Sequence, residues 1–96
     1  MDVREQQVLY YKTALDARPF REWRSKIADE DTLAAIDARI ARFRNGNFGD
    51  SKPIGGGAAE SRIHFGPGYR IYYGRDGNEV VVLLCGGDKS TQDAGH

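Results

Sequence analysis

The hydrophobic pattern of this 96-residue chain changes its period part-way along the sequence. From Phe20 to Phe43 the apolar residues recur at the spacing of an α-helix, about 3.6 residues. From Ser61 onward they alternate with polar residues or run continuously, as they do in β-strands. Because the two patterns occupy different parts of the chain, they predict an α+β domain with helices packed on an antiparallel sheet.

The first predicted helix is short and has an aromatic face. Phe20, Trp23 and Ile27 are spaced so that they fall on one side of a helix. Asp16 is the expected N-cap, and Pro19 stands in the first turn, where its missing N–H group is tolerated.

A second helix is predicted between the acidic segment Asp29–Thr32 and the pair Asn45–Gly46. Acidic residues stabilise a helix N-terminus through the helix dipole, and Asn-Gly suits the left-handed backbone that ends a helix. The apolar residues of this helix again share one face: Leu33, Ile36, Ile40 and Phe43. A short link joins the two helices, so an antiparallel helical hairpin is expected.

Strands are predicted at both ends of the chain. Val8–Tyr11 is rich in strand formers and is expected to join the sheet. Ser61–Phe65, Tyr69–Tyr73 and Glu79–Cys85 are expected to form a three-stranded antiparallel meander with tight turns. Phe48–Ala59 contains a proline and four glycines and is interpreted as a loop.

Size and composition indicate one domain, covering residues 1–96. Cys85 is the only cysteine, so an internal disulfide is excluded and a reducing, cytoplasmic location is expected. No segment approaches the roughly 20 apolar residues that span a bilayer, so no membrane association is expected. With one cysteine and two histidines the chain is not expected to form a closed zinc site, and no cofactor is expected.

The distribution of charge is more informative than the net charge, which is zero. Residues 39–75 contain only two acidic residues, Asp50 and Glu60. The basic residues of the same segment number seven: Arg39, Arg42, Arg44, Lys52, Arg62, Arg70 and Arg75. A basic segment in a neutral chain predicts a local anion-binding face, with scattered solvated charges as the alternative.

Strand alternation predicts which side chains share the sheet face away from the helices. Ile63, Phe65, Tyr69, Ile71 and Tyr73 are expected to point toward the helices. The intervening residues then share the opposite face, where side chains on adjacent strands lie about 4.5–8 Å apart. These residues are Arg62, His64, Arg70 and Tyr72.

This set of side chains suits an RNA phosphodiester. Arg62 and Arg70 can bind phosphate oxygens, with Lys89 adding charge from beyond the last strand. His64 can act as general acid or base when a ribose 2′-hydroxyl attacks, and Tyr72 can stack on a base. Such chemistry requires no metal. Arg44 and Lys52, from the basic segment, complete the predicted RNA-binding residues.

Structural roles are open alternatives for the same residues. Arg62 and Arg70 can be solvated, or can pair with Glu60 or Glu79. A histidine on a strand is often structural, and Tyr72 can simply pack.

Four segments carry a resemblance to a known family: Phe20–Trp23, Gly46–Asp50, Arg62–Tyr72 and Leu83–Gln92. They resemble the HigB-like "addiction module killer protein" branch of the RelE/ParE toxin superfamily. The similarity covers nearly the whole chain. It implies a RelE-like fold and the toxin of a type II toxin–antitoxin pair. It also implies a partner, a small antitoxin that in this branch is usually a helix-turn-helix DNA-binding protein.

In RelE-like members the activity is cleavage of messenger RNA, commonly on the ribosome, by basic residues of the open sheet face and without metal. Carried onto this sequence, the resemblance implies roles for Arg62, Arg70 and Lys89. Relatives continue with a further helix, whereas this sequence reads Asp93–His96, so the C-terminal helix is expected to be absent. Two alternatives stay open. One is a non-enzymatic, ParE-like inhibitor of DNA gyrase, and the other is a degenerate toxin that only binds its antitoxin.

Overall fold

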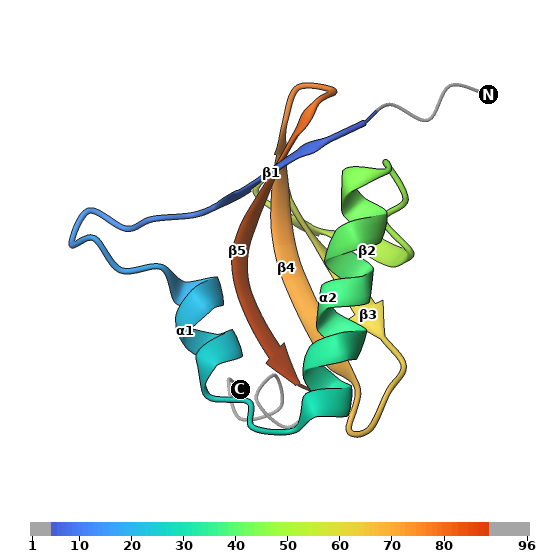
Figure 1. Cartoon of the computed structure of the whole chain (residues 1–96). Helices are drawn as coiled ribbons and strands as arrows, with labels where there is room; N and C mark the ends of the chain where they lie inside the picture. Colours follow the sequence, from blue (N-terminus) through green and yellow to red (C-terminus); the bar gives the residue numbers. More distant parts are fainter. Residues whose placement is uncertain (1–4, 89–96) are drawn as a thin grey trace.

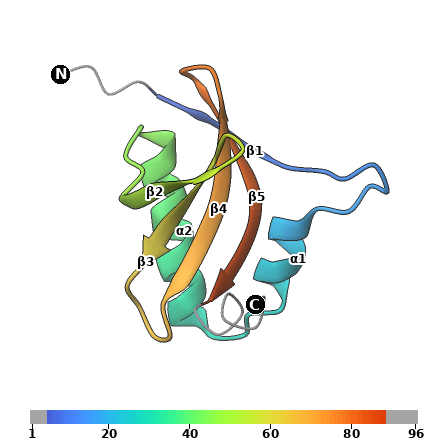
Figure 2. The same ribbon diagram turned by 180° about the vertical axis from the view of Figure 1, so that it is seen from behind.

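The structure is a computed structural model and describes residues 5–88. Two helices cover one side of a five-stranded sheet (Figure 1). The elements are β1 (Gln7–Tyr10), α1 (Pro19–Ser25), α2 (Glu30–Arg44), β2 (Asp50–Gly55), β3 (Ala58–Ile63), β4 (Tyr69–Asp76) and β5 (Val80–Asp88). Seen from behind, the sheet stands in front of α2, and α1 lies beside β5 (Figure 2).

The sheet is mixed, with the strand order β1-β5-β4-β3-β2. β1 runs parallel to β5, whereas the other neighbours are antiparallel. The first strand therefore joins the sheet, and β5 lies inside it, as predicted. The fold class α+β is confirmed. The predicted antiparallel sheet is wrong in two respects, because β1 pairs in parallel and the sheet has five strands where four were expected. Within residues 5–88, no helix combines the length and apolarity needed to cross a bilayer.

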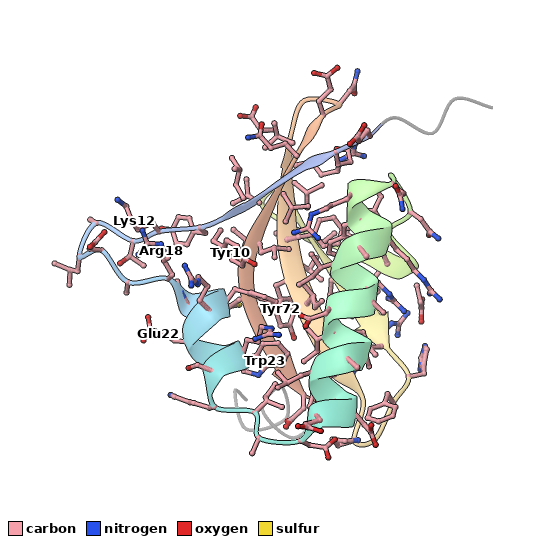
Figure 3. The ribbon with its side chains drawn as sticks, viewed as in Figure 1. Tyr10, Lys12, Arg18, Glu22, Trp23 and Tyr72 are labelled. Atoms are coloured by element: carbon pink, nitrogen blue, oxygen red, sulfur yellow. The ribbon has the colours of Figure 1, made fainter. Side chains whose placement is uncertain are left out.

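Both helices lie on the same side of the sheet, but each packs mainly on strands and not on the other helix, so the predicted helical hairpin is not a closely packed pair. α1 contacts β5, whereas α2 contacts β1 and β3. Arg24 of α1 and Asp37 of α2 form an ion pair with an N–O distance of 2.6 Å. In Figure 3, Trp23 extends from α1 toward the sheet. Its indole lies against Gly86 of β5, where the absence of a side chain makes room for the ring.

The predicted N-cap of α1 is wrong. The helix begins at Pro19, as the proline suggested, but the N-cap position is Arg18. Asp16 has a φ of 66°, in the left-handed region, and its backbone N–H donates to the carbonyl of Thr13. Asp16 therefore belongs to a tight turn before the helix, a position that aspartate tolerates well.

The ends of α2 follow the prediction. Asp29 is the N-cap, and its carboxylate accepts hydrogen bonds from the backbone N–H and the hydroxyl of Thr32. Asn45 is the C-cap, and Gly46 follows with a φ of 79°. The Asp29 carboxylate and the Asn45 backbone N–H thus supply partners for backbone groups that the ends of a helix otherwise leave without them.

The Asp29 cap predicts an acid-sensitive contribution to stability. The hydrogen bonds from Thr32 hold the pKa of Asp29 below its ordinary value of 3.8. A lowered folded-state pKa adds stability that is present above the unfolded pKa and is lost as the pH falls through the folded pKa. Asp29→Asn keeps an acceptor but no longer titrates, so its melting temperature should fall less than that of the wild type between neutral pH and about pH 2. Equal losses in thermal melts of the two proteins would contradict the cap.

The segment predicted to be a loop is instead a β-hairpin. β2 pairs antiparallel with β3, which begins at Ala58 and ends at Ile63. Pro53 is tolerated because β2 is an edge strand, where a missing N–H group need not break the ladder. The turn uses Gly55–Gly57, whose φ angles of 99°, 63° and 81° suit glycine. Proline and glycines conceal the strand pattern from sequence alone.

The core lies between the sheet and the two helices. Its buried residues are Phe20, Ile36, Ile40, Phe43, Ile63, Ile71, Tyr73, Val81 and Leu83. The predicted inward positions on β4 are thus confirmed, with Tyr69 packed at the edge of the core. The prediction for Phe65 is wrong, because this side chain is 40% exposed. β3 has already ended, and the Gly68 N–H donates to the Phe65 carbonyl in the following turn.

Candidate anion-binding site on the open sheet face

The site lies on the sheet face opposite the helices, called the open face below. Antiparallel partners place their side chains on the same face, so the strand register defines rows across the sheet. One row consists of Asp50 on β2, Arg62 on β3, Arg70 on β4 and Gly87 on β5. The two predicted arginines are therefore direct neighbours on adjacent strands.

A second row runs beside the first, farther from the β3–β4 turn. It consists of Lys52 on β2, Glu60 on β3, Tyr72 on β4 and Cys85 on β5. Tyr72 projects from β4 in Figure 3. Burial raises the pKa of Tyr72, so the phenol is neutral and keeps its proton at physiological pH. Burial likewise raises the pKa of the Cys85 thiol, which argues against a reactive thiolate.

Glu60 is the centre of the second row and is fully buried. Both of its carboxylate oxygens accept hydrogen bonds from Nη1 of Arg70, at 3.2 and 3.1 Å. Lys52 Nζ lies 3.6 Å from Oε1 of the same carboxylate. Arg70 is only 17% exposed, so this pair is largely removed from solvent. Both hydrogen bonds use one nitrogen of Arg70, so the other two guanidinium nitrogens take no part in this pair.

Asp50 stands at the β2 end of the first row and bridges two predicted site residues. Its Oδ1 lies 3.3 Å from Nη2 of Arg62, and its Oδ2 lies 2.7 Å from Nε2 of His64. The hydrogen bond with His64, and then the charge of Arg62, hold the pKa of Asp50 below its ordinary value of 3.8. Asp50 is therefore a carboxylate at neutral pH.

A hollow of about 220 Å³ opens beside these rows. Its lining residues are Arg62, Ile63, His64, Gly68, Tyr69 and Arg70. Arg62, His64 and Arg70 thus bring two guanidiniums and an imidazole to one concave surface. Guanidinium groups arranged in this way can bind the oxygens of a phosphate group.

The carboxylates moderate the charge of this surface. Arg62, Arg70 and Lys52 supply three positive charges, and Asp50 and Glu60 supply two negative ones. The five side chains therefore sum to one positive charge when His64 is neutral. The surface is organised by ion pairs, in which Asp50 pairs with Arg62 and Glu60 pairs with Arg70 and Lys52.

The structure brings five of the seven predicted site residues together on the open face. These are Arg62, His64, Arg70, Tyr72 and Lys52. Arg44 is not among them, because it ends α2 on the other side of the sheet. Lys89 lies outside the described residues.

The sequence indicated that Arg70 could bind a phosphate or pair with an acidic residue. It did not reveal that Asp50 and Glu60 organise the basic side chains of the open face. Asp50 and Glu60 are the only acidic residues of the basic segment 39–75, and that isolation was the available signal. Their partners depend on the β2–β3 register, which was hidden while the β2 segment was interpreted as a loop. Within residues 5–88, no three His, Cys, Asp or Glu side chains gather as a metal site.

One further arginine supports the site from beneath. Arg39 of α2 donates through Nη1 to the hydroxyl of Ser61 at 2.7 Å and to the carbonyl of Arg62 at 2.8 Å. Gly49 has a φ of 66° and lies so close that a Cβ atom there would be 2.6 Å from Nη1 of Arg39. Arg39 therefore connects α2 to the end of β3, which carries Arg62, and lies close to the start of β2, which carries Asp50.

Comparison with known proteins places the chain among relatives without giving an activity. An uncharacterized protein of Haemophilus influenzae (strain ATCC 51907 / DSM 11121 / KW20 / Rd) is 50% identical over 74 residues, which make up 77% of this chain and 75% of that protein. The chain belongs to the family of this Haemophilus protein. No family model matches the chain. No solved structure matches it either.

Proposed function

We propose that this chain is the toxin of a type II toxin–antitoxin pair, a HigB-like member of the RelE/ParE superfamily that cleaves messenger RNA in the cytoplasm. The observation that carries the proposal is the placement of Arg62, Arg70 and His64 around one hollow on the open face. The sequence resemblance supplies the family, and the α+β sheet with helices on one face agrees with the expected architecture.

The geometry suggests how each residue acts in this reaction. Arg62 and Arg70 hold the oxygens of the scissile phosphate and stabilise the charge that develops on phosphorus. His64 takes the proton of the ribose 2′-hydroxyl as that oxygen attacks. Tyr72 offers its ring, and Lys52 its charge, to the flanking nucleotide. None of these roles requires a bound metal.

The charge pattern of the open face favours a nucleic acid over a protein target. A mostly apolar outer face would favour a ParE-like inhibitor of gyrase. The two rows instead carry Asp50, Arg62, Arg70, Lys52 and Glu60 on that face. The proposed partner is a small antitoxin, usually a helix-turn-helix protein in this branch.

The proposal is tested by induced expression in cells, with translation, transcript ends and plasmid supercoiling followed together. Arg62→Ala should reduce new transcript ends about 100-fold, because a preorganised donor to the developing charge is lost. Arg70→Lys should also reduce cleavage, because a lysine keeps the charge opposite Glu60 but lacks the planar fork. Arg75→Ala makes the same charge change at an arginine that stacks on Phe48, away from the hollow, and should leave cleavage unchanged.

Two outcomes would count against the nuclease. Intact transcripts with falling supercoiling would favour a gyrase inhibitor. Intact transcripts, normal supercoiling and tight antitoxin binding would indicate a toxin without activity.

A further inference from the structure

The register of the sheet places Asp50 beside Arg62, and His64 lies just past the end of β3. Asp50 on β2 is paired directly with Arg62 on β3, and the imidazole of His64, two residues farther along, contacts Asp50. The carboxylate is thereby placed between the guanidinium and the imidazole, at 3.3 and 2.7 Å. This arrangement concerns residues of the proposed nuclease site, so the inference rests on the proposed function.

The contact selects one tautomer of the imidazole. A carboxylate only accepts hydrogen bonds, so the nitrogen next to Asp50, Nε2 of His64, must carry a proton. The other nitrogen, Nδ1, then holds the free lone pair when the ring is neutral. The His64 side chain is 75% exposed, so a substrate can reach it.

The carboxylate itself is held from two directions. Arg62 pairs with its second oxygen. The backbone just before Asp50 is restricted because Gly49 lies close to the guanidinium of Arg39. Arg39 in turn donates a hydrogen bond to the carbonyl of Arg62. An exposed ion pair on its own fixes a side chain weakly. Here the strand pairing and the Arg39 contacts restrict both partners, so the carboxylate can orient the ring.

We propose that Asp50 is a positioning residue for RNA cleavage, holding His64 as the Nε2–H tautomer so that Nδ1 is the atom that moves the proton. Nδ1 takes the proton of the 2′-hydroxyl while the 2′-oxygen forms its bond to phosphorus. The bond from phosphorus to the 5′-oxygen breaks, and its electron pair leaves with that oxygen. The proton passes from His64 to the 5′-oxygen, which leaves a 2′,3′-cyclic phosphate and a 5′-hydroxyl. The reaction is balanced without any further reactant.

A double-mutant cycle tests whether Asp50 acts through His64. His64→Gln should lower kcat roughly 100-fold or more, since general acid–base catalysis contributes about that much. Asp50→Asn should lower kcat at least about 10-fold with little change in KM, because the tautomer and orientation of the ring are lost while the phosphate contacts stay. The double variant should be no slower than His64→Gln alone, because both substitutions remove the same proton transfer by the imidazole.

The cycle separates this role from the others that Asp50 could have. If the losses from Asp50→Asn and His64→Gln multiply, Asp50 does not act through the imidazole and the inference fails. If Asp50→Asn speeds cleavage or tightens RNA binding, Asp50 is a competing anion and the inference fails as well. If the wild-type chain cleaves no RNA, the proposed function and this inference fall together.

Nitrogen NMR of the His64 ring provides a readout that does not depend on activity. The neutral ring in the wild type should carry its proton on Nε2, and Asp50→Ala should produce a mixture of both tautomers. His64→Gln identifies the signals, since the only other histidine is His96. A proton on Nδ1 in the wild type would overturn the inference even if the protein is an active nuclease.

Discussion

Gly86→Ala should destabilise the protein far more than the same substitution at Gly74, another glycine within a strand. A Cβ atom at Gly86 would lie 2.1 Å from Cε3 of Trp23, far inside contact distance. The indole is the part of α1 that packs on β5, next to Phe20 and Tyr69. This overlap can be relieved only if α1, which carries Trp23, moves away from the sheet. Overpacking of this kind should lower the free energy of unfolding by about 3 kcal/mol. The melting temperature should then fall by more than about 10 °C.

Gly74→Ala is the matched control for this prediction. Gly74 also lies in a strand, but a Cβ atom there would meet only the carbonyl oxygen of Gly57, at 3.8 Å. Its effect on stability should stay within about 1 kcal/mol. Chemical denaturation followed by the fluorescence of Trp23, the only tryptophan, measures both variants. A Gly86→Ala protein as stable as Gly74→Ala would contradict the packing of α1 on β5.

Glu60→Gln should have an effect of similar size for an electrostatic reason. Glu60 is fully buried and accepts both hydrogen bonds from Arg70, which is itself 17% exposed. Removing one partner of a buried pair leaves the other charge without compensation. The expected loss of unfolding free energy is about 3 kcal/mol.

A second variant separates the ion pair from the packing around it. Glu60→Met with Arg70→Met removes both charges at similar volume and should recover most of the lost stability. Glu22→Gln removes an exposed carboxylate on α1 and should change stability by less than about 0.5 kcal/mol. If Glu60→Gln were as mild as Glu22→Gln, the buried pair would not organise the open face. The same pair explains why Arg70→Lys tests catalysis better than Arg70→Ala, which would leave Glu60 buried without its partner.

The sequence predicted those parts of the fold that depend on local pattern. Helical spacing located three of the four predicted apolar residues of α2 in the core, all except Leu33. Alternation placed Arg62, Arg70 and Tyr72 on the face away from the helices. Such features follow from the period of side chains along one element, which the sequence contains directly.

Features that depend on pairing between elements were not predictable in the same way. The β2 strand was missed because Pro53 and the glycines interrupt its alternation, and tertiary pairing with β3 overrides that local preference. Without β2 there was no register, so the placement of Asp50 beside Arg62 and His64 was not visible. Phe65 was assigned to the core because alternation does not reveal where a strand ends.

The most direct test of the central claim is to map the ends of messenger RNA in a reconstituted translation reaction after adding the purified chain. The account predicts new 3′ ends that carry a 2′,3′-cyclic phosphate, formed about 100-fold more slowly by Arg62→Ala than by the wild type or Arg75→Ala. Full-length message in the presence of the folded wild-type chain, or cleavage that Arg62→Ala does not slow, would contradict it.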